Sequence, residues 1–326
     1  DFLFGIGSWQ VATGKLALLV LFVILALTLY AYKKLGHDRW KIVHKFIGLA
    51  LALGVVHAFY VPGEVSVIPL LRYYLLLIGL VGISAFLWRT VFQMFKRNEY
   101  EYEFVSVNNL GAEIYEVVLR PLHKKISHMP GQFAFVRIIQ GAYDKKSHPF
   151  TISSSPDDQY IRFSIKALGD YTKSLAAIAS GTRCRIEGPF GRFTYSTTPE
   201  THQLWVAGGI GVTPFLSMAR FFKDQGSTMG YDIDMYYSGK SLEELVFLKE
   251  LREIAAALKQ GFRVHTFDSS KQGHLTAGII AQEIKDVQGR DMFICGPMAM
   301  MDALSGQLVL LGLPSSKIHK EDFALR

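Results

Sequence analysis

Three long apolar runs dominate the first part of the chain and limit what it can fold into. They occupy residues 16–32 (extended backwards by residues 11–14), 42–61 and 67–92, and few charged side chains interrupt them. A helix needs about 20 consecutive apolar residues to cross a bilayer. Buried core helices of a soluble protein are the alternative, which three such runs joined by short loops disfavour. We therefore expect three membrane-spanning helices within residues 1–97.

Charged residues beside these runs predict the orientation of the helices. The loop at residues 62–64 has no Lys or Arg, whereas basic residues crowd the junction of the first two runs and the end of the third run. Because basic loops favour the cytoplasmic face, residues beyond 97 are expected in the cytoplasm and the protein in the cell membrane. The basic residues concerned are Lys33, Lys34, Arg39, Lys41, Lys45, Arg89, Lys96 and Arg97.

Net charge and cysteine content exclude several classes of function. The net charge is +7, but its basic residues lie partly at the edges of apolar runs, so we expect a lipid bilayer as partner and no nucleic acid. Cys184 and Cys295 are too far apart to form a disulfide framework or a metal motif. The first residue is Asp1 rather than Met, and we expect the chain to begin partway into a longer protein.

Two histidines lie within the second apolar run. His44 and His57 are ionisable residues in a predicted membrane span, and such residues usually mark functional sites. A neutral imidazole is also a common axial ligand of haem iron. Either histidine is alternatively an interfacial residue near one membrane face. Arg72, at the start of the third run, is a candidate for binding a haem propionate or for holding a developing oxyanion, and is alternatively a snorkelling interfacial residue.

The pattern changes to short β-rich runs in residues 98–198. Residues 104–107, 115–119 and 133–138 have strand length, with Gly and Pro between them. They predict a small antiparallel barrel. Farther on, residues 170–172 lead from Gly169 into a helix expected from Lys173, and a helix start of this kind favours an anion.

Strands alternate with helices in residues 199–326. Expected strands at residues 203–207, 232–237 and 262–267, with helices from Pro214 and Leu242, predict a parallel doubly wound sheet. Such sheets bind ligands at the carboxyl ends of their strands. A Gly-rich turn before Pro214 lets the backbone approach a pyrophosphate. Cys295, taken alone, reads as a buried small hydrophobic residue.

Three motifs, in this order, resemble the ferredoxin-reductase family: residues 148–151 (HPFT), 208–214 (GGIGVTP) and 295–297 (CGP). With the two histidines in front, nearly the whole chain is similar to the NADPH oxidase and ferric reductase superfamily, as a bacterial-type NADPH oxidase homologue. The resemblance implies that residues 1–97 are helices four to six of a six-helix haem domain. It implies that His44 and His57 each bind one of two b-type haems, and that missing earlier helices carry the opposing ligands.

The resemblance also implies the flavin site. Phe150 would pack on the isoalloxazine, Thr151 would hydrogen-bond near the reactive nitrogen, and His148 would face the ribityl or pyrophosphate group. Many relatives have Arg at the position of His148, which leaves its role open. The FAD-binding residues so assigned are His148, Pro149, Phe150, Thr151, Ser153, Ile165, Lys166, Gly169, Tyr171 and Thr172.

The nicotinamide site follows from the same resemblance. Cys295 would lie beside the hydride path, and Phe323 would stack on the flavin and move aside for the nicotinamide. A hydrophobic tail anchor is the alternative for Phe323. Thr151, Cys295 and Phe323 are thus the predicted catalytic residues. The predicted nucleotide-binding residues are Gly208, Gly209, Gly211, Val212, Thr213, Pro214, Ser238, Lys240, Cys295, Gly296, Pro297 and Phe323.

Residues at the adenosine end bear on the choice between NADPH and NADH. Ser238 and Lys240 have the hydrogen-bonding groups and charge for a 2′-phosphate. No acidic residue stands directly beside them in the sequence, and the guanidinium frequent in NADPH-specific relatives is missing. We expect NADPH, with use of NADH left open.

The resemblance implies hydride transfer from NAD(P)H to FAD and single-electron passage through two haems to O₂ on the outer face, yielding superoxide. No protein partner is required on this interpretation. One alternative is a ferric or cupric reductase with the same electron path. Another is a membrane-anchored flavin reductase that passes electrons to a partner protein, with neither histidine binding haem. A non-enzymatic haem or flavin sensor is disfavoured by the intact hydride-path motifs.

Overall fold

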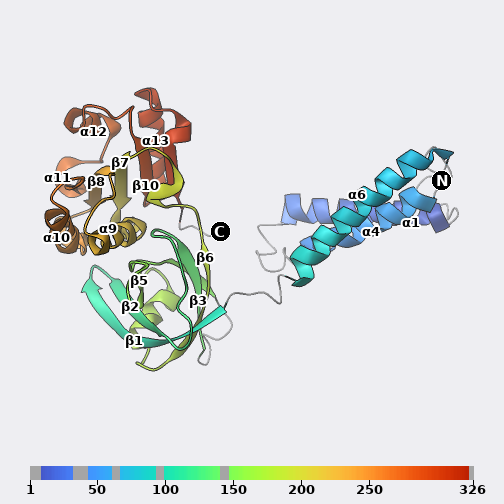
Figure 1. Cartoon of the computed structure of the whole chain (residues 1–326), viewed down its shortest axis with the longest axis horizontal. Helices are drawn as coiled ribbons and strands as arrows, with labels where there is room; N and C mark the ends of the chain where they lie inside the picture. Colours follow the sequence, from blue (N-terminus) through green and yellow to red (C-terminus); the bar gives the residue numbers. More distant parts are fainter. Residues whose placement is uncertain (1–8, 32–42, 61–66, 93–98, 140–146, 323–326) are drawn as a thin grey trace. The chain divides into compact units, whose positions relative to one another are not determined.

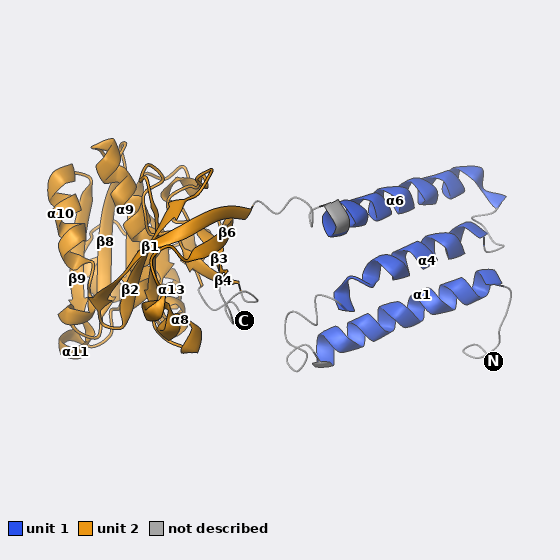
Figure 2. Ribbon diagram, turned by 90° about the horizontal axis from the view of Figure 1, so that it is seen from below, with its two compact units in different colours: residues 1–97, 326 blue, residues 98–325 orange. Residues whose placement is uncertain are grey.

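The chain divides into two compact units, Asp1–Arg97 and Asn98–Leu325. The computed structural model describes residues 9–31, 43–60, 67–92, 99–139 and 147–322. Figure 2 distinguishes the units by colour, and each is considered by itself. The described part of the first unit is helical, whereas the second contains two β-sheets (Figure 1).

Apolar helices make up the described part of the first unit. Their bounds are α1 (Trp9–Ala26), α4 (Ile47–Tyr60) and α6 (Pro69–Leu87), with single π-helical turns η1 (Leu27–Ala31) and η2 (Trp88–Phe92) at the ends of α1 and α6. Large apolar side chains such as Leu18, Phe22 and Leu70 are exposed. So much exposed apolar surface is unusual for a monomer in water and indicates a surface that contacts lipid or protein.

The predicted spans agree with the helices only in part. Trp9–Tyr30 and Pro69–Thr90 are long and apolar enough to cross a membrane. The second run is shorter than expected, because residues 45 and 46 form a turn and α4 begins at Ile47. Its 14 residues extend about 21 Å, less than the hydrocarbon thickness of about 30 Å. The expectation of three full-length spans is therefore wrong for the described part of the second run.

The first part of the second unit is the predicted antiparallel barrel-like sheet. Its strand order is β4-β3-β6-β1-β2-β5. Burial alternates along β3, where Ala134, Val136 and Ile138 face the core. The strands are β1 (Glu99–Gly111), β2 (Ile114–Pro121), β3 (Phe133–Ile138), β4 (His148–Thr151), β5 (Ile161–Lys166) and β6 (Arg183–Phe190), followed by a short turn η5 (Tyr195–Thr197).

A parallel sheet follows, in the order β11-β10-β7-β8-β9. All its strand pairs are parallel, as the alternation of strands and helices predicted. The strands are β7 (His202–Gly208), β8 (Asp232–Gly239), β9 (Phe262–Asp268), β10 (Asp291–Cys295) and β11 (Ile318–Glu321). The helices and helical turns are η6 (Gly209–Val212), α9 (Thr213–Gln225), η7 (Leu242–Glu244), α10 (Leu248–Leu258), α11 (Ser269–Gln272), α12 (Ala277–Glu283), α13 (Met298–Leu310) and η8 (Ser315–Lys317).

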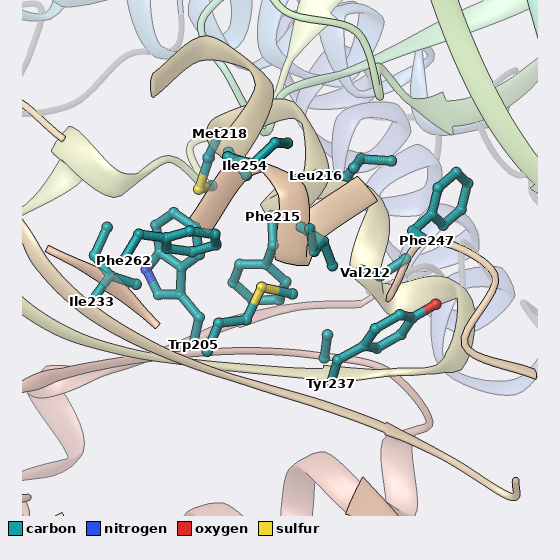
Figure 3. Close-up of a cluster of buried hydrophobic side chains, with 14 of the residues drawn as sticks. Trp205, Val212, Phe215, Leu216, Met218, Ile233, Tyr237, Phe247, Ile254 and Phe262 are labelled. Atoms are coloured by element: carbon teal, nitrogen blue, oxygen red, sulfur yellow. The ribbon is translucent and has the colours of Figure 1, made fainter. Parts of the chain in front are cut away.

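Both faces of this sheet bury apolar side chains. Trp205 points into a cluster with Phe215 and Phe222 of α9, which Figure 3 shows in part. Its neighbours Leu204 and Val206 point the other way, into a cluster with residues of α12 and α13. Helices therefore cover both faces and leave the strand ends as the place for a ligand.

Two predicted helix starts are shifted in the structure. The helix expected from Leu242 is a single 3₁₀ turn, and α10 begins only at Leu248. Leu245 and Phe247 are buried in the sheet cluster, so this stretch turns inward before the helix begins. The helix expected from Lys173 begins earlier, at Asp170, as the five-residue α8 (Asp170–Ser174), which a 3₁₀ turn η4 (Leu175–Ala177) follows.

Candidate functional site

A cavity of about 560 Å³ lies in the second unit beside β4. Most of the predicted flavin-binding residues line it: His148, Pro149, Phe150, Thr151, Ile165, Lys166, Gly169, Tyr171 and Thr172. Ser153 does not, because its side chain is buried and its Oγ accepts a hydrogen bond of 2.9 Å from Ser164 Oγ. The β4 and β5 strands and the turn into α8 thus bring together residues that are up to 24 positions apart in the sequence (148 to 172).

Aromatic rings stack in this cavity. The His148 and Tyr171 rings lie 3.7 Å apart between centroids, with 27° between their planes. The Phe150 ring is nearly parallel to that of Tyr171, at 13°, with the centroids 6.5 Å apart. Parallel aromatic faces offer planar apolar surfaces on which a ring system such as a flavin can stack.

The predicted anion site at Gly169 is a short turn. The Gly169 amide donates a hydrogen bond of 3.0 Å to the Thr172 hydroxyl, and that hydroxyl is also 3.0 Å from the Gly169 carbonyl. Since α8 has five residues, its dipole is small. What the structure provides here is the wall of the cavity formed by Gly169, Tyr171 and Thr172.

The Gly-rich turn touches the turn after β10. A Cβ atom placed on Gly211 would lie 2.3 Å from the Cys295 carbonyl oxygen, and one on Gly208 would lie 2.8 Å from Cδ of Pro297. Both positions therefore need glycine so that the two turns can approach each other. The pairing of β7 with β10, which sets Ala207 beside Cys295, places both turns at the carboxyl edge of the sheet.

The cavity beside β4, the flavin cavity, is bounded by both domains of this unit. Ile210 of η6 and Thr213, the first residue of α9, line it together with Thr151 of β4. A ligand on the flavin strand therefore lies next to the start of the helix at which a nucleotide pyrophosphate is expected.

Matches to known protein families agree with a site formed by a flavin-binding and a nucleotide-binding domain. Residues 99–209 match the FAD-binding domain family, and residues 205–306 match the oxidoreductase NAD-binding domain family. This part of the chain is a ferredoxin-NADP reductase-like flavin reductase module.

Similar proteins include reductase components of monooxygenases. The chain is 30% identical over 209 residues to a glycine betaine monooxygenase reductase subunit of Chromohalobacter salexigens, covering 60% of this chain and 55% of that one. It is 28% identical over 204 residues to the ferredoxin reductase component of a 3-ketosteroid-9-alpha-monooxygenase of Mycobacterium tuberculosis, covering 61% and 56%. The chain thus spans about half the length of these curated relatives.

A solved structure has the same fold as the module. It is the FAD/NAD-binding domain of a nitric oxide dioxygenase from Vibrio cholerae, with a TM-score of 0.59 and 21% identity. The match covers 68% of this chain and 97% of that chain.

Glu321 and Asp322 are residues of the reductase module that sequence reasoning missed. Both line the flavin cavity, and Glu321 pairs with Cys295 across β10 and β11. A Cβ atom on Gly191 would lie 4.0 Å from Oε1 of Glu321, so this carboxyl group reaches toward the flavin-binding sheet. Burial, with the Asp322 charge nearby, raises the pKa of Glu321 to about 7. An acidic pair at the end of a strand on the carboxyl edge was the signal that could have identified them.

Cys295, a predicted catalytic residue, is fully buried. Burial, with smaller effects of the Glu321 and Asp322 charges, raises the pKa of its thiol well above the usual range. The thiol therefore stays protonated. The backbone carbonyl of Cys295 makes the contact with Gly211, whereas its side chain belongs to the apolar cluster of Trp205 and Phe215. A buried, protonated thiol is not a nucleophile, and Cys295 does not line the cavity beside β4, so its place beside the hydride path stays a prediction.

At the predicted adenosine end, the structure places an acidic group, Glu244, beside Lys240. Lys240 is exposed and Ser238 is buried, at the end of β8. The Lys240 amide lies 3.4 Å from Oε2 of Glu244, an oxygen that can accept its hydrogen bond. In the sequence no acidic residue stands directly beside Ser238 and Lys240. The turn η7 brings Glu244 back to the Lys240 amide, which the sequence pattern does not reveal.

The other predicted nucleotide-binding residues have these positions. Gly209 has a φ of +54°, a conformation that favours glycine, and Pro214 stands in the first turn of α9. Val212 and Thr213 are buried, and Thr213 Oγ1 donates a hydrogen bond of 3.1 Å to the Ile210 carbonyl. Phe323 lies outside the described residues, so its role stays a prediction.

In the helical unit, His57 lines a cavity of about 820 Å³ whose walls are mostly apolar. Its Nδ1 lies 2.7 Å from the Gln10 carbonyl oxygen, and a Cβ on Gly14 would lie 2.6 Å from the ring. When Nδ1 donates to that carbonyl, Nε2 carries the lone pair that binds a metal. Arg72 lines the same cavity, with its guanidinium carbon 4.0 Å from the Phe59 ring centroid.

His44 has different surroundings. It lies before the turn that precedes α4, so the two histidines are not on one continuous helix. Its side chain is exposed, and it does not line the cavity at His57. Among the described residues there is no group of three or more His, Cys, Asp or Glu that could hold a metal ion. Ligation by His44 and His57 thus stays a prediction.

Proposed function

We propose that this chain is a flavin-dependent NAD(P)H oxidoreductase that delivers electrons to a separate protein acceptor. The observation that carries the proposal is the cavity shared by Phe150 and Thr151 of the flavin strand and by Ile210, Thr213 and Glu321 of the nucleotide domain. Bound FAD would accept a hydride from NAD(P)H and release its electrons one at a time. That conversion is what a two-electron donor and a one-electron acceptor require.

Each group of residues has a defined part in this reaction. The parallel rings of Phe150 and Tyr171 would hold a planar ring system. The close glycine contacts of Gly208 and Gly211 with the turn after β10 would keep the nicotinamide turn near the flavin cavity. With a pKa of about 7, Glu321 can hold or release a proton there near neutral pH.

The reductase components of oxygenases among the relatives support a protein acceptor over superoxide production. An acceptor with a one-electron redox centre, such as an iron protein, fits this chemistry. Residues 238–244 support no strict preference for NADPH, since Lys240 and Glu244 stand at the same turn with opposite charges.

A second candidate function is supported by the helical unit. If α1 and α6 cross a membrane, with the reductase module in the cytoplasm, electrons would pass through haem to an acceptor on the outer face, O₂ or a ferric or cupric ion. The surroundings of His57 fit one haem, because a backbone carbonyl bonds one ring nitrogen while Arg72 lines the same cavity as a propionate partner. The exposure of His44 provides no comparable support for a second haem.

One experiment separates these functions. The purified full chain is loaded with FAD and mixed anaerobically with NADH or NADPH while flavin absorbance is followed. Cytochrome c is then added in air with and without superoxide dismutase, and haem is assayed by its pyridine complex. Flavin bleaching with dismutase-insensitive cytochrome c reduction and no haem supports the first proposal. A haem signal with dismutase-sensitive reduction supports the second, and lack of bleaching refutes both.

A further inference from the structure

Helix α9 bonds to the flavin-binding sheet through polar side chains. Ser217 Oγ donates a hydrogen bond of 2.7 Å to the Ser154 carbonyl, and both residues are fully buried. Gln225 Nε2 donates one of 2.7 Å to Oδ2 of Asp157 at an exposed position near the end of the helix. Both acceptors lie in the segment that follows β4, which carries the flavin motif.

Arg220, between these two positions, makes the most extensive contact. Its Nε and Nη2 donate to the two carboxylate oxygens of Glu250, at 2.7 and 2.9 Å. Nη1 donates to the Ser153 carbonyl at 2.9 Å, and Nη2 also donates to Oε1 of Glu116 at 3.1 Å. One guanidinium therefore joins α9 and α10 to β2 and to the residue two positions after Thr151.

Burial and charge make this contact rigid. Arg220 is 7% exposed, and the Arg220 and Glu116 side chains are 8% and 13% exposed. Burial alone would lower the Arg220 pKa, but hydrogen bonds and charge from Glu250, then Glu116, outweigh it and the pKa is raised. The guanidinium stays charged, and a planar group with several bonds in a fixed fork has few alternative positions.

The position of Arg220 links it to the reacting groups. Arg220 lies about two helical turns after Thr213, which lines the flavin cavity. Its bond to Ser153 reaches the segment directly after the flavin strand β4, two residues beyond Thr151. A movement of α9 against this strand would move the Gly-rich turn against the flavin cavity. Hydride transfer requires the reacting atoms to be held about 3–3.5 Å apart, so such a movement would slow it.

We propose that Arg220 is a positioning residue, which fixes the nicotinamide turn of α9 at hydride-transfer distance from the flavin strand. The inference rests on the proposed NAD(P)H–FAD reaction. It assigns the function to a side chain about two turns away from the cavity, in addition to the residues that line it.

The test compares R220M, R220K and E116Q with the control Q225A in the full chain. Gln225 supplies the exposed bond between the same two parts, so Q225A tests whether any lost contact suffices. FAD content is measured first. Anaerobic stopped-flow reduction by NADH and by NADH deuterated at the transferred position then gives the rate, the apparent affinity for NADH and the isotope effect.

R220M is expected to keep its FAD and its apparent affinity for NADH within about threefold, while flavin reduction slows about 10²-fold and its isotope effect becomes more temperature-dependent. R220K should recover part of the rate, since it restores the charge without the fork. E116Q should slow reduction less, and Q225A should match the unmodified chain.

Two results would overturn the proposal. The first is a flavin-reduction rate in FAD-loaded R220M equal to that of the unmodified chain. The second applies if R220M fails to retain FAD: unchanged flavin-reduction rates in both R220K and E116Q would then refute the role of Arg220. These outcomes leave the proposed function intact when the unmodified chain is reduced. If NADH and NADPH fail to reduce the unmodified chain, the proposed function fails and this inference with it.

Discussion

Replacing Gly211 by Ala tests how closely the two nucleotide turns must approach. The new Cβ would lie 2.3 Å from the Cys295 carbonyl oxygen, 2.5 Å from its carbonyl carbon and 2.7 Å from the Gly296 nitrogen. These are backbone atoms at the end of a central parallel strand, and they cannot rotate away as a side chain does. One of the two turns must therefore move.

The size of the movement predicts the size of the effect. Ordinary contacts begin at 3.4 Å, so the turns must separate by about 1 Å. A displacement of about 1 Å near the reacting atoms can cost about 10²-fold in rate, which corresponds to about 2.7 kcal/mol. Overpacking of this kind typically also lowers the free energy of unfolding by about 1–3 kcal/mol. For a module of this size that lowers Tm by about 2–12 °C.

The assay is anaerobic stopped-flow reduction of the FAD-loaded chain by NADH and NADPH, with a thermal melt on the same sample. Gly306→Ala in α13 is the matched control, since no heavy atom lies within 4 Å of its added Cβ. Alanine in a helix interior is favoured over glycine by about 0.5–1 kcal/mol, so this variant should melt slightly higher and react normally. If G211A is reduced as fast as the unmodified chain, the assignment of this turn to the nicotinamide is refuted.

Three further predictions concern the same module. Phe150→Ala should weaken FAD binding about 10- to 100-fold, measured by titration of the apoprotein, because a stacking ring is lost; unchanged affinity would remove Phe150 from the flavin site. Burial raises the pKa of Glu321 to about 7, so this residue's contribution to stability is fully present below its unfolded pKa of about 4.3 and is lost as pH rises through 7. Glu321→Gln should flatten that fall in unfolding free energy, measured by denaturant titration from about pH 4 to about pH 8. An identical pH profile in the variant and the unmodified chain would contradict the burial of this carboxyl group. Glu244→Gln should raise kcat/KM for NADPH relative to NADH about 3- to 10-fold by removing a negative charge beside the Lys240 amide, with Glu253→Gln on α10 as control; a ratio that does not change would show that Glu244 does not affect the 2′-phosphate.

Local sequence patterns predicted much of the module. The strand expected at residues 133–138 is β3, and the strand at residues 203–207 lies within β7. Thr213 and Pro214 predicted the start of α9 because proline fits the first turn of a helix. Phe150 and Thr151 were identified from four consecutive residues, and they do line the cavity.

Patterns of apolar residues were less informative in the helical unit. They predicted one continuous second span, whereas the turn at residues 45 and 46 separates His44 from α4. Apolar composition is similar on both sides of such a turn, so periodicity does not reveal it. The bond from His57 to the Gln10 carbonyl was equally hidden, since its partners are 47 residues apart.

The amino-acid sequence by itself determined the order of the elements, the glycine-rich and proline-containing turns and the flavin motif, because each depends on backbone preferences within a few residues. Only the tertiary structure decided which distant groups meet. Pairing of β10 with β11 brings Glu321 beside Cys295, and packing of α9 brings Arg220 between Glu116 and Glu250. These contacts depend on burial and charge at long sequence separation, where a local pattern carries no information about the partner.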